Sequence, residues 1–154
     1  MGELFELATL VFPLLSSAQV AQAVQDWVSM PEAEGQAIGC WRTEIGPLGR
    51  LLVLRRFDDG LALANERRRA LMSSSPFNSG SLISALEMDS YVRFPFLPPM
   101  TADRDDAVYE FRTYRLKPGG LPATLSGWES AIRHRWATSS EFAINQRTGA
   151  PIAD

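Results

Sequence analysis

The sequence of 154 residues predicts an α+β protein with a ferredoxin-like domain over residues 1–95, in which the element order is β-α-β-β-α-β. Three observations support this fold class. Strand-like and helix-like patterns alternate in that order along the chain. Turn residues join the two middle strands into a hairpin. The opening strand pattern then recurs from residue 108, which predicts a duplicated domain.

The first strand and the first helix are predicted within residues 4–31. Residues 4–12 have the composition of a strand. Ser16 then offers a helix N-cap, and Gln19 lies three residues later, as in a capping box. The helix has one apolar stripe at the i, i+3, i+4, i+7, i+8 spacing, formed by Val20, Ala23, Val24, Trp27 and Val28.

A β-hairpin is predicted next. Residues 37–44 and 50–57 have strand composition, and the segment between them, Gly46-Pro47-Leu48-Gly49, supplies the turn residues. We therefore expect these two strands to pair antiparallel.

The second helix and the last strand complete the domain. Asp58-Asp59-Gly60 predicts where the helix begins, and Ser73-Ser74-Ser75-Pro76 predicts where it ends. We expect Leu63, Arg67, Ala70 and Leu71 on its inner face, and Arg68 and Arg69 on its solvent face. A short stretch with one helical turn then leads into a strand over residues 86–94.

The strand pattern also predicts a second sheet. In a ferredoxin-like domain both helices cover the same face of the sheet. Residues 51–54 are nevertheless apolar at every position, so both faces of that strand are apolar. A bare apolar sheet in water is an association site. We therefore expect another sheet, from a second chain or a second domain, to pack on the face without helices.

The duplicated part begins after a linker at residues 96–107, which is rich first in proline and then in charge. A strand is predicted over residues 108–116. A helix follows, and its apolar face is formed by Leu121, Leu125, Trp128 and Ile132. Residues 133–154 contain no counterpart of the hairpin. We therefore interpret residues 108–154 as an incomplete second copy, of the kind that a frameshift in the gene would leave.

Composition narrows the classes of function. The net charge of −3 argues against a nucleic-acid partner, which usually requires a basic face. Cys40 is the only cysteine, so no internal disulfide can form. No stretch approaches the roughly 20 apolar residues of a membrane helix. These features predict a cytoplasmic protein without an integral membrane segment.

Two motifs resemble the NIPSNAP family. The first is Tyr109-Glu110-Phe111-Arg112-Thr113-Tyr114, followed by Lys117-Pro118-Gly119, and it is similar to the Tyr-Glu-Leu-Arg-Thr-Tyr strand that opens the family's domain. The second is Gly39-x-Trp41-Arg42-Thr43-Glu44-Ile45-Gly46-Pro47-Leu48, which is similar to the hairpin at the centre of that domain. By pattern the resemblance covers residues 3–95 and 108–132.

The resemblance implies a dimeric α/β barrel, in which two ferredoxin-like sheets close around a shared cavity. Many members of the family carry two tandem domains. This chain differs from the family at Ala8, where the motif has an arginine, and in its incomplete second copy. We therefore expect the barrel to close between two chains, as a homodimer.

Glu6, Arg42 and Glu44 are the candidate ligand-binding residues. Arg42 and Glu44 share one face of a predicted strand and Glu6 lies on a neighbouring strand, so together they could orient a small polar ligand. The alternative is that Arg42 and Glu44 form cross-strand pairs that keep the hairpin soluble. We expect Trp41 in the core and Cys40 as a small buried hydrophobe.

Two classes of function follow. A small-molecule-binding or monooxygenase-like protein needs an apolar cavity with few polar anchors, and therefore leaves few motifs. The alternative is a non-catalytic protein-interaction module, or a remnant of a two-domain protein. No cofactor is predicted: His134 is the only histidine, and we expect it to be solvated and not a haem ligand. No catalytic residue is predicted.

Overall fold

The computed structural model describes residues 3–98, 108–136, 143–145 and 150–152, with side chains for residues 3–98 and 108–132. The chain forms two compact units, residues 1–90 and 91–154. This division lies close to the predicted domain end at residue 95. Most of the predicted linker, residues 99–107, lies outside the described residues.

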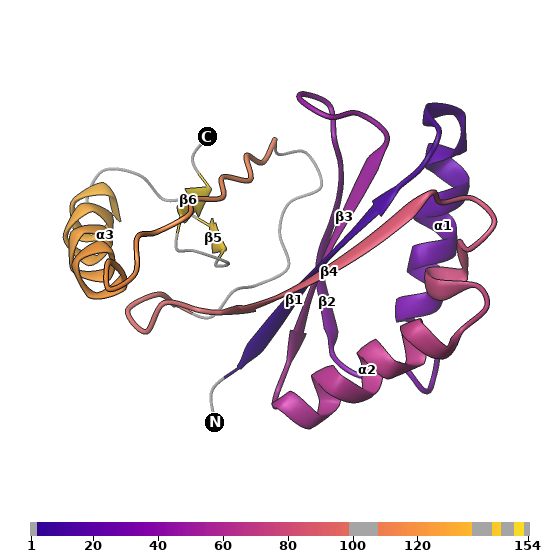
Figure 1. The fold of residues 1–154 in the computed structure, drawn as a ribbon, viewed down its shortest axis with the longest axis horizontal. Coiled ribbons are helices and arrows are strands. Elements are labelled where there is room, and N and C mark those ends of the chain that lie inside the picture. The colour runs from indigo at the N-terminus through magenta and orange to yellow at the C-terminus, as the bar shows by residue number, and fades with distance from the viewer. Residues whose placement is uncertain (1–2, 99–107, 137–142, 146–149, 153–154) are drawn as a thin grey trace. The chain divides into compact units, whose positions relative to one another are not determined.

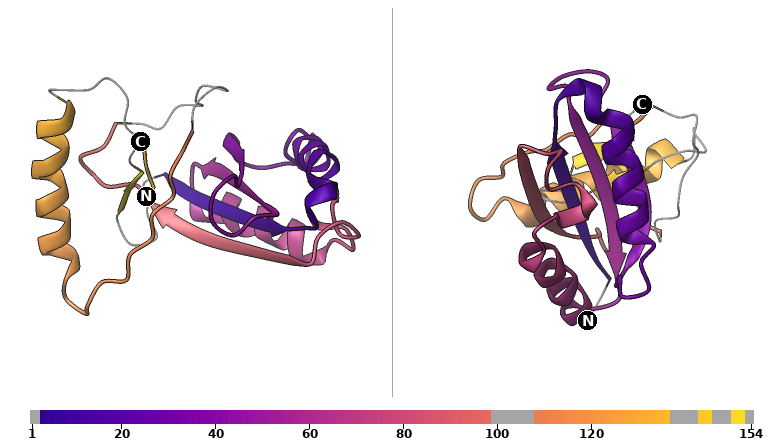
Figure 2. Two further views of the ribbon diagram at one scale, coloured as in Figure 1. Left: turned by 90° about the horizontal axis from the view of Figure 1, so that it is seen from above. Right: turned by 90° about the vertical axis from the view of Figure 1, so that its right-hand side faces the viewer.

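The first unit has the predicted β-α-β-β-α-β order (Figures 1 and 2). Its elements are β1 (Leu4–Val11), α1 (Ser17–Val28), β2 (Gln36–Arg42), β3 (Arg50–Phe57), α2 (Gly60–Met72) and β4 (Ala85–Val92), with short 3-10 helices η1 (Leu14–Ser16) and η2 (Pro76–Asn78). The strands form one sheet in the order β2-β3-β1-β4, and β3 pairs antiparallel with both β1 and β2. The ferredoxin-like domain is confirmed.

The hydrophobic core lies between the sheet and the two helices, which cover the same face (Figure 1). The register places Ala8 opposite Val53 and Leu10 opposite Leu51, so these four side chains share the helix-covered face. They pack with Val20, Val24 and Trp27 of α1 and with Ala70 and Phe77. The apolar stripe predicted for α1 is thus confirmed by its three buried residues.

The beginning of α1 differs from the prediction. Ser16 is the N-cap residue, but its side chain accepts no hydrogen bond, so the predicted capping box with Gln19 is not formed. An N-cap side chain reaches the first helical N–H groups from an extended backbone. Ser16 instead has φ −91° and ψ 1°, because it ends the 3-10 turn η1.

The predicted N-cap of α2 is confirmed, but the prediction of which residues form its inner face is only partly correct. The Asp59 carboxylate accepts hydrogen bonds from two backbone N–H groups, both at 2.9 Å. Leu63 and Ala70 are buried as predicted. Leu71, however, is 71% exposed, and Glu66 lies on the inner face at 1% exposure. The helix therefore directs a carboxylate into the core.

The second unit contains α3 (Leu121–Trp136) and a small pairing of β5 (Ala143–Asn145) with β6 (Ala150–Ile152). The predicted apolar face of α3 is confirmed at its centre, where Leu125, Trp128 and buried Ile132 pack with Phe94, Phe96 and Leu97. The strand predicted over residues 108–116 is not formed. A strand requires a hydrogen-bonded neighbour, and no described segment forms a ladder with these residues.

Candidate functional site

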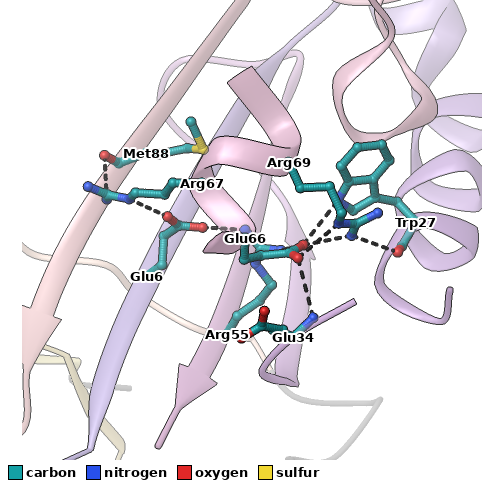
Figure 3. A network of polar contacts seen from close by, with 8 residues as sticks. All are labelled: Glu6, Trp27, Glu34, Arg55, Glu66, Arg67, Arg69 and Met88. Carbon is teal, nitrogen blue, oxygen red and sulfur yellow. Dashed lines mark hydrogen bonds and ion pairs between the residues drawn. The ribbon is translucent and has the colours of Figure 1, made fainter. Parts of the chain in front are cut away.

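Five charged side chains meet between the sheet and the helices of the first unit (Figure 3). We call them the ion network; its members are Glu6 of β1, Arg55 of β3, and Glu66, Arg67 and Arg69 of α2. Arg55 is central: it donates to Glu66 Oε1 at 2.5 Å and to Glu6 Oε1. These three side chains are only 2%, 1% and 0% exposed, respectively.

Two further arginines complete the ion network. Arg67 Nε donates to Glu6 Oε2 at 2.6 Å, and its Nη2 donates to the carbonyl oxygen of Met88 on β4 at 2.8 Å. Arg69 donates to both oxygens of Glu66, at 2.9 and 2.7 Å. Each buried carboxylate is therefore held by two guanidinium groups, as a buried charge requires.

The ion network also ties the two helices together. The Arg69 guanidinium lies 3.7 Å from the centre of the Trp27 ring, and its Nη2 donates to the Trp27 carbonyl at 3.2 Å. The Trp27 Nε1–H group donates to Glu66 Oε1 at 3.3 Å. The sequence predicts Arg69 on the solvent face of α2, and this prediction is wrong: the cation–π contact and these hydrogen bonds hold it against α1.

Glu66 remains ionised in this setting. Burial opposes its ionisation, but the hydrogen bond from Arg69, the charge of Arg55 and the backbone N–H of Glu34 outweigh burial and hold the pKa of Glu66 below its ordinary value. Both oxygens of Glu66 already accept hydrogen bonds within the protein. We therefore interpret the ion network as a structural connection between sheet and helices.

The opposite face of the same sheet is a second apolar surface. The register places Leu7 opposite Leu54, and Leu52 opposite both Thr9 and Trp41. We define the helix-free face as Phe5, Leu7, Thr9, Trp41, Leu52, Leu54 and Arg56. Most of these side chains are apolar. Phe5, Leu7 and Leu54 are buried within the chain, and the other four are partly exposed. The register thus confirms that β3 is apolar on both faces.

Trp41 lies on the helix-free face and not in the helix-covered core. A Cβ atom added at Gly39 would lie 2.2 Å from Cζ2 of the Trp41 ring, which is too close for any side chain. The indole therefore folds over Gly39. The Gly-x-Trp spacing of the hairpin motif has a physical reason: the glycine makes room for the indole.

The structure places the three predicted site residues in two different settings. Glu6 belongs to the buried ion network. Arg42 and Glu44 pair with each other at 3.1 Å, with side chains 59% and 70% exposed. Arg42 lies opposite Leu51, on the helix-covered side, and its Nη1 is 3.4 Å from Ser17 Oγ. Arg42 is the last residue of β2 and Glu44 lies two residues later in the turn, so the pair does not connect two strands. A ligand-binding role for these residues stays a prediction.

The lone cysteine is not activated as a nucleophile. Cys40 is exposed, contrary to the interpretation as a buried hydrophobe. Desolvation by neighbouring groups nevertheless raises the pKa of its thiol to about 11, so the thiol is protonated at neutral pH. The side chain of His134 lies outside the described side chains. Among the side chains that are described, no three His, Cys, Asp or Glu residues gather into a metal site.

Arg55 and Glu66, the centre of the ion network, were missed by sequence reasoning. Arg55 interrupts the apolar run of β3, and Glu66 lies between Leu63 and Ala70 on the inner stripe of α2. Two opposite charges at inward-facing positions were the available signal. The sequence alone does not pair these two charges, because their contact is fixed only when α2 packs on the sheet.

Comparison with known sequences gives two findings. The NIPSNAP family profile matches residues 109–144. The NipSnap protein of Drosophila melanogaster is 20% identical over 113 residues, which cover 70% of this chain and 41% of that protein. The chain therefore spans less than half the length of this relative. None of the described helices combines the length and the hydropathy needed to cross a bilayer.

Solved structures confirm the fold. An uncharacterized NIPSNAP domain protein from Burkholderia xenovorans superposes with a TM-score of 0.50 at 19% identity, covering 62% of this chain and 99% of its own. A NIPSNAP family protein from Agrobacterium tumefaciens gives a TM-score of 0.51 at 17% identity, covering 62% and 90%. Profile and relative agree with the resemblance that the two motifs carry: the chain is similar to NIPSNAP proteins in sequence, and the solved structures share its fold.

Proposed function

We propose that the first unit pairs with the same unit of a second copy into a two-sheet barrel, and that the enclosed helix-free faces bind an apolar small molecule. The apolar second face of β1 and β3 carries this proposal. Leu7, Leu52 and Leu54 lie on the side that neither α1 nor α2 covers. Packing one sheet on another is the usual way in which such faces are buried.

The chemistry of the helix-free face indicates the kind of ligand. Binding cavities are mostly apolar, with a few polar groups that orient the ligand. Trp41 offers a ring for stacking, and Thr9 and Arg56 are the polar members of the face. Arg56 forms an ion pair with Glu3, with Nη1 3.4 Å from Glu3 Oε1. We therefore favour an apolar or aromatic ligand with one polar end, bound on this face and not at the Arg42–Glu44 pair.

A monooxygenase-like activity is the narrower form of the same proposal. Such chemistry on an activated substrate requires an apolar cavity and one or two polar anchors more than a catalytic motif. It depends on ligand binding to the helix-free face, so a protein that binds no apolar ligand there would refute this narrower form as well.

The oligomeric state is the first test. We expect light scattering on the full chain to show a dimer at micromolar concentration. Leu52→Arg, at the centre of the helix-free face, should give a monomer, because a buried unpaired charge opposes sheet packing. The matched control is Leu71→Arg on α2, where the side chain is 71% exposed and should leave the dimer intact. A wild-type monomer would refute the barrel.

Ligand binding is the second test. Apolar aromatic compounds should raise the melting temperature of the wild-type protein, because a ligand present at 100 times its Kd stabilises the folded state by about 2.7 kcal/mol. Trp41→Ala should weaken this effect. A dimer that no compound in the panel stabilises would support the alternative of a non-catalytic protein-interaction module.

A further inference from the structure

Four aliphatic side chains are exposed at one end of the first unit's sheet. Leu14 and Leu15, in the connection from β1 to α1, are 62% and 101% exposed. Ile45 and Leu48, in the turn between β2 and β3, are 91% and 52% exposed. We call these four residues the loop patch. The largest exposed apolar patch of a monomer is often a site of interaction.

The two connections form one surface. The backbone N–H of Phe12 donates to the carbonyl oxygen of Gly49 at 2.8 Å. Gly49 has φ +70°, and a Cβ atom there would lie 2.4 Å from the Phe12 carbonyl oxygen, so only glycine permits this approach. The same added Cβ atom would lie 3.8 Å from Cδ2 of Leu14, so the Leu14 side chain lies beside Gly49. Figure 1 shows both connections at the same end of the sheet.

Size and shape separate the candidate partners of the loop patch. The loop patch consists of four side chains, whereas a stable protein interface involves about 20–30 residues on each side. A stable protein interface buries about 800 Å² on each partner and is usually anchored by aromatic residues or arginine. The loop patch is smaller and purely aliphatic. Leu15 and Ile45 are almost fully exposed, so they project outward and do not line a concave site.

Charge around the loop patch is low. Arg42 and Glu44 neutralise each other at 3.1 Å, which leaves Arg50 as the one unbalanced charge of the hairpin end. An apolar surface without strong charge fits the boundary between headgroups and acyl chains, where binding strength follows the apolar area that is inserted.

We propose that the loop patch inserts into the interface of a phospholipid bilayer, so that the protein binds membranes peripherally. Apolar insertion drives this binding, and anionic lipid and low salt contribute little, because one positive charge attracts an anionic surface only weakly. The proposal is independent of the helix-free face and of any ligand bound there.

Vesicle flotation with the full chain tests the proposal. The probes are vesicles of phosphatidylcholine alone and of phosphatidylcholine with phosphatidylserine, each at low and high salt. The loop variant is Leu15→Asp with Ile45→Asp. The matched control is Leu61→Asp with Leu71→Asp on α2, where the side chains are 70% and 71% exposed. Circular dichroism checks that both variants fold, since all four sites are exposed.

We expect the wild type and the control to float with both kinds of vesicle, and the loop variant to lose at least tenfold in apparent affinity. The affinity of the wild type should change less than threefold with salt. Absence of wild-type flotation, or an equal loss in both variants, would overturn the proposal. Binding only to phosphatidylserine at low salt would also overturn it. Self-association that the loop variant abolishes, without vesicle binding, would assign the loop patch to a second copy instead.

Discussion

Removing the central cation of the ion network is the most direct test of how the first unit is held together. In Arg55→Met, an unbranched apolar side chain of similar length replaces the guanidinium, so the change leaves little cavity. Glu6 and Glu66 then remain buried at 0% and 1% exposure, each without one of its two arginines. Arg67 and Arg69 still hold them.

The magnitude follows from that partial loss. Removing one partner of a buried ion pair usually costs about 3–5 kcal/mol, because the remaining charge is left uncompensated. Here each carboxylate keeps a second guanidinium, so we expect about 3 kcal/mol, at the lower end of this range. The matched control is Arg42→Met, which breaks the exposed pair with Glu44. Exposed pairs contribute about 0–1 kcal/mol, so the control should change stability little.

Urea denaturation of the full chain, followed by far-ultraviolet circular dichroism, measures both variants. The free energy of unfolding should fall for Arg55→Met and stay within about 1 kcal/mol of wild type for Arg42→Met. If Arg55→Met costs no more than the control, the buried charges do not depend on Arg55, and the interpretation of the ion network as the sheet–helix connection is wrong.

Three further predictions concern the same unit. The pKa of Glu66 is lower in the folded state than in the unfolded state, where it is near 4.3, so its ionisation stabilises the fold fully above that pH and this contribution is lost as pH falls through the folded-state pKa. In Glu66→Gln, the free energy of unfolding should therefore depend less on pH in the acid range. An unchanged pH dependence would contradict this. Asp59→Ala removes the α2 cap and should cost about 1 kcal/mol in urea denaturation, whereas exposed Asp58→Ala should not. Gly39→Ala should lower the free energy of unfolding by about 1–3 kcal/mol when Trp41 is present, and by clearly less in a Trp41→Ala background. A double-mutant cycle measures the two losses. Equal losses would show that the Trp41 ring is not what excludes a side chain at position 39.

The corresponding glutamates of the two similar segments, Glu6 and Glu110, have different surroundings. Glu6 in the first unit is buried and paired with Arg55 from the adjacent strand. Ala8, which stands where the motif has arginine, is 0% exposed in the helix-covered core, where an arginine has no room. In the second unit, Glu110 accepts two hydrogen bonds from Arg112, at 2.7 and 2.6 Å, on the surface. The duplication stays a prediction, which the profile match over residues 109–144 supports.

Local signals predicted local structure well. The strand over 50–57 and the Asp59 cap could be read from the sequence, because each depends on a few neighbouring residues. The capping box predicted at Ser16 does not form, because a 3-10 turn precedes the helix. The path of the chain into the helix decides whether the side chain can reach the first helical N–H groups. The strand predicted over residues 108–116 does not form, because a strand also needs a hydrogen-bonded neighbour, which its own sequence does not supply.

The sequence by itself determined the order of strands and helices in the first unit, the resemblance to the NIPSNAP family and the apolar character of both faces of β3. Only the tertiary structure decided what the charged residues do. It brought Arg55 of the sheet against Glu66 of α2 and separated Glu6 from Arg42 and Glu44. The physical reason is that apolar periodicity acts along each element, whereas an ion pair between distant elements exists only once packing has excluded water and fixed the distance between them.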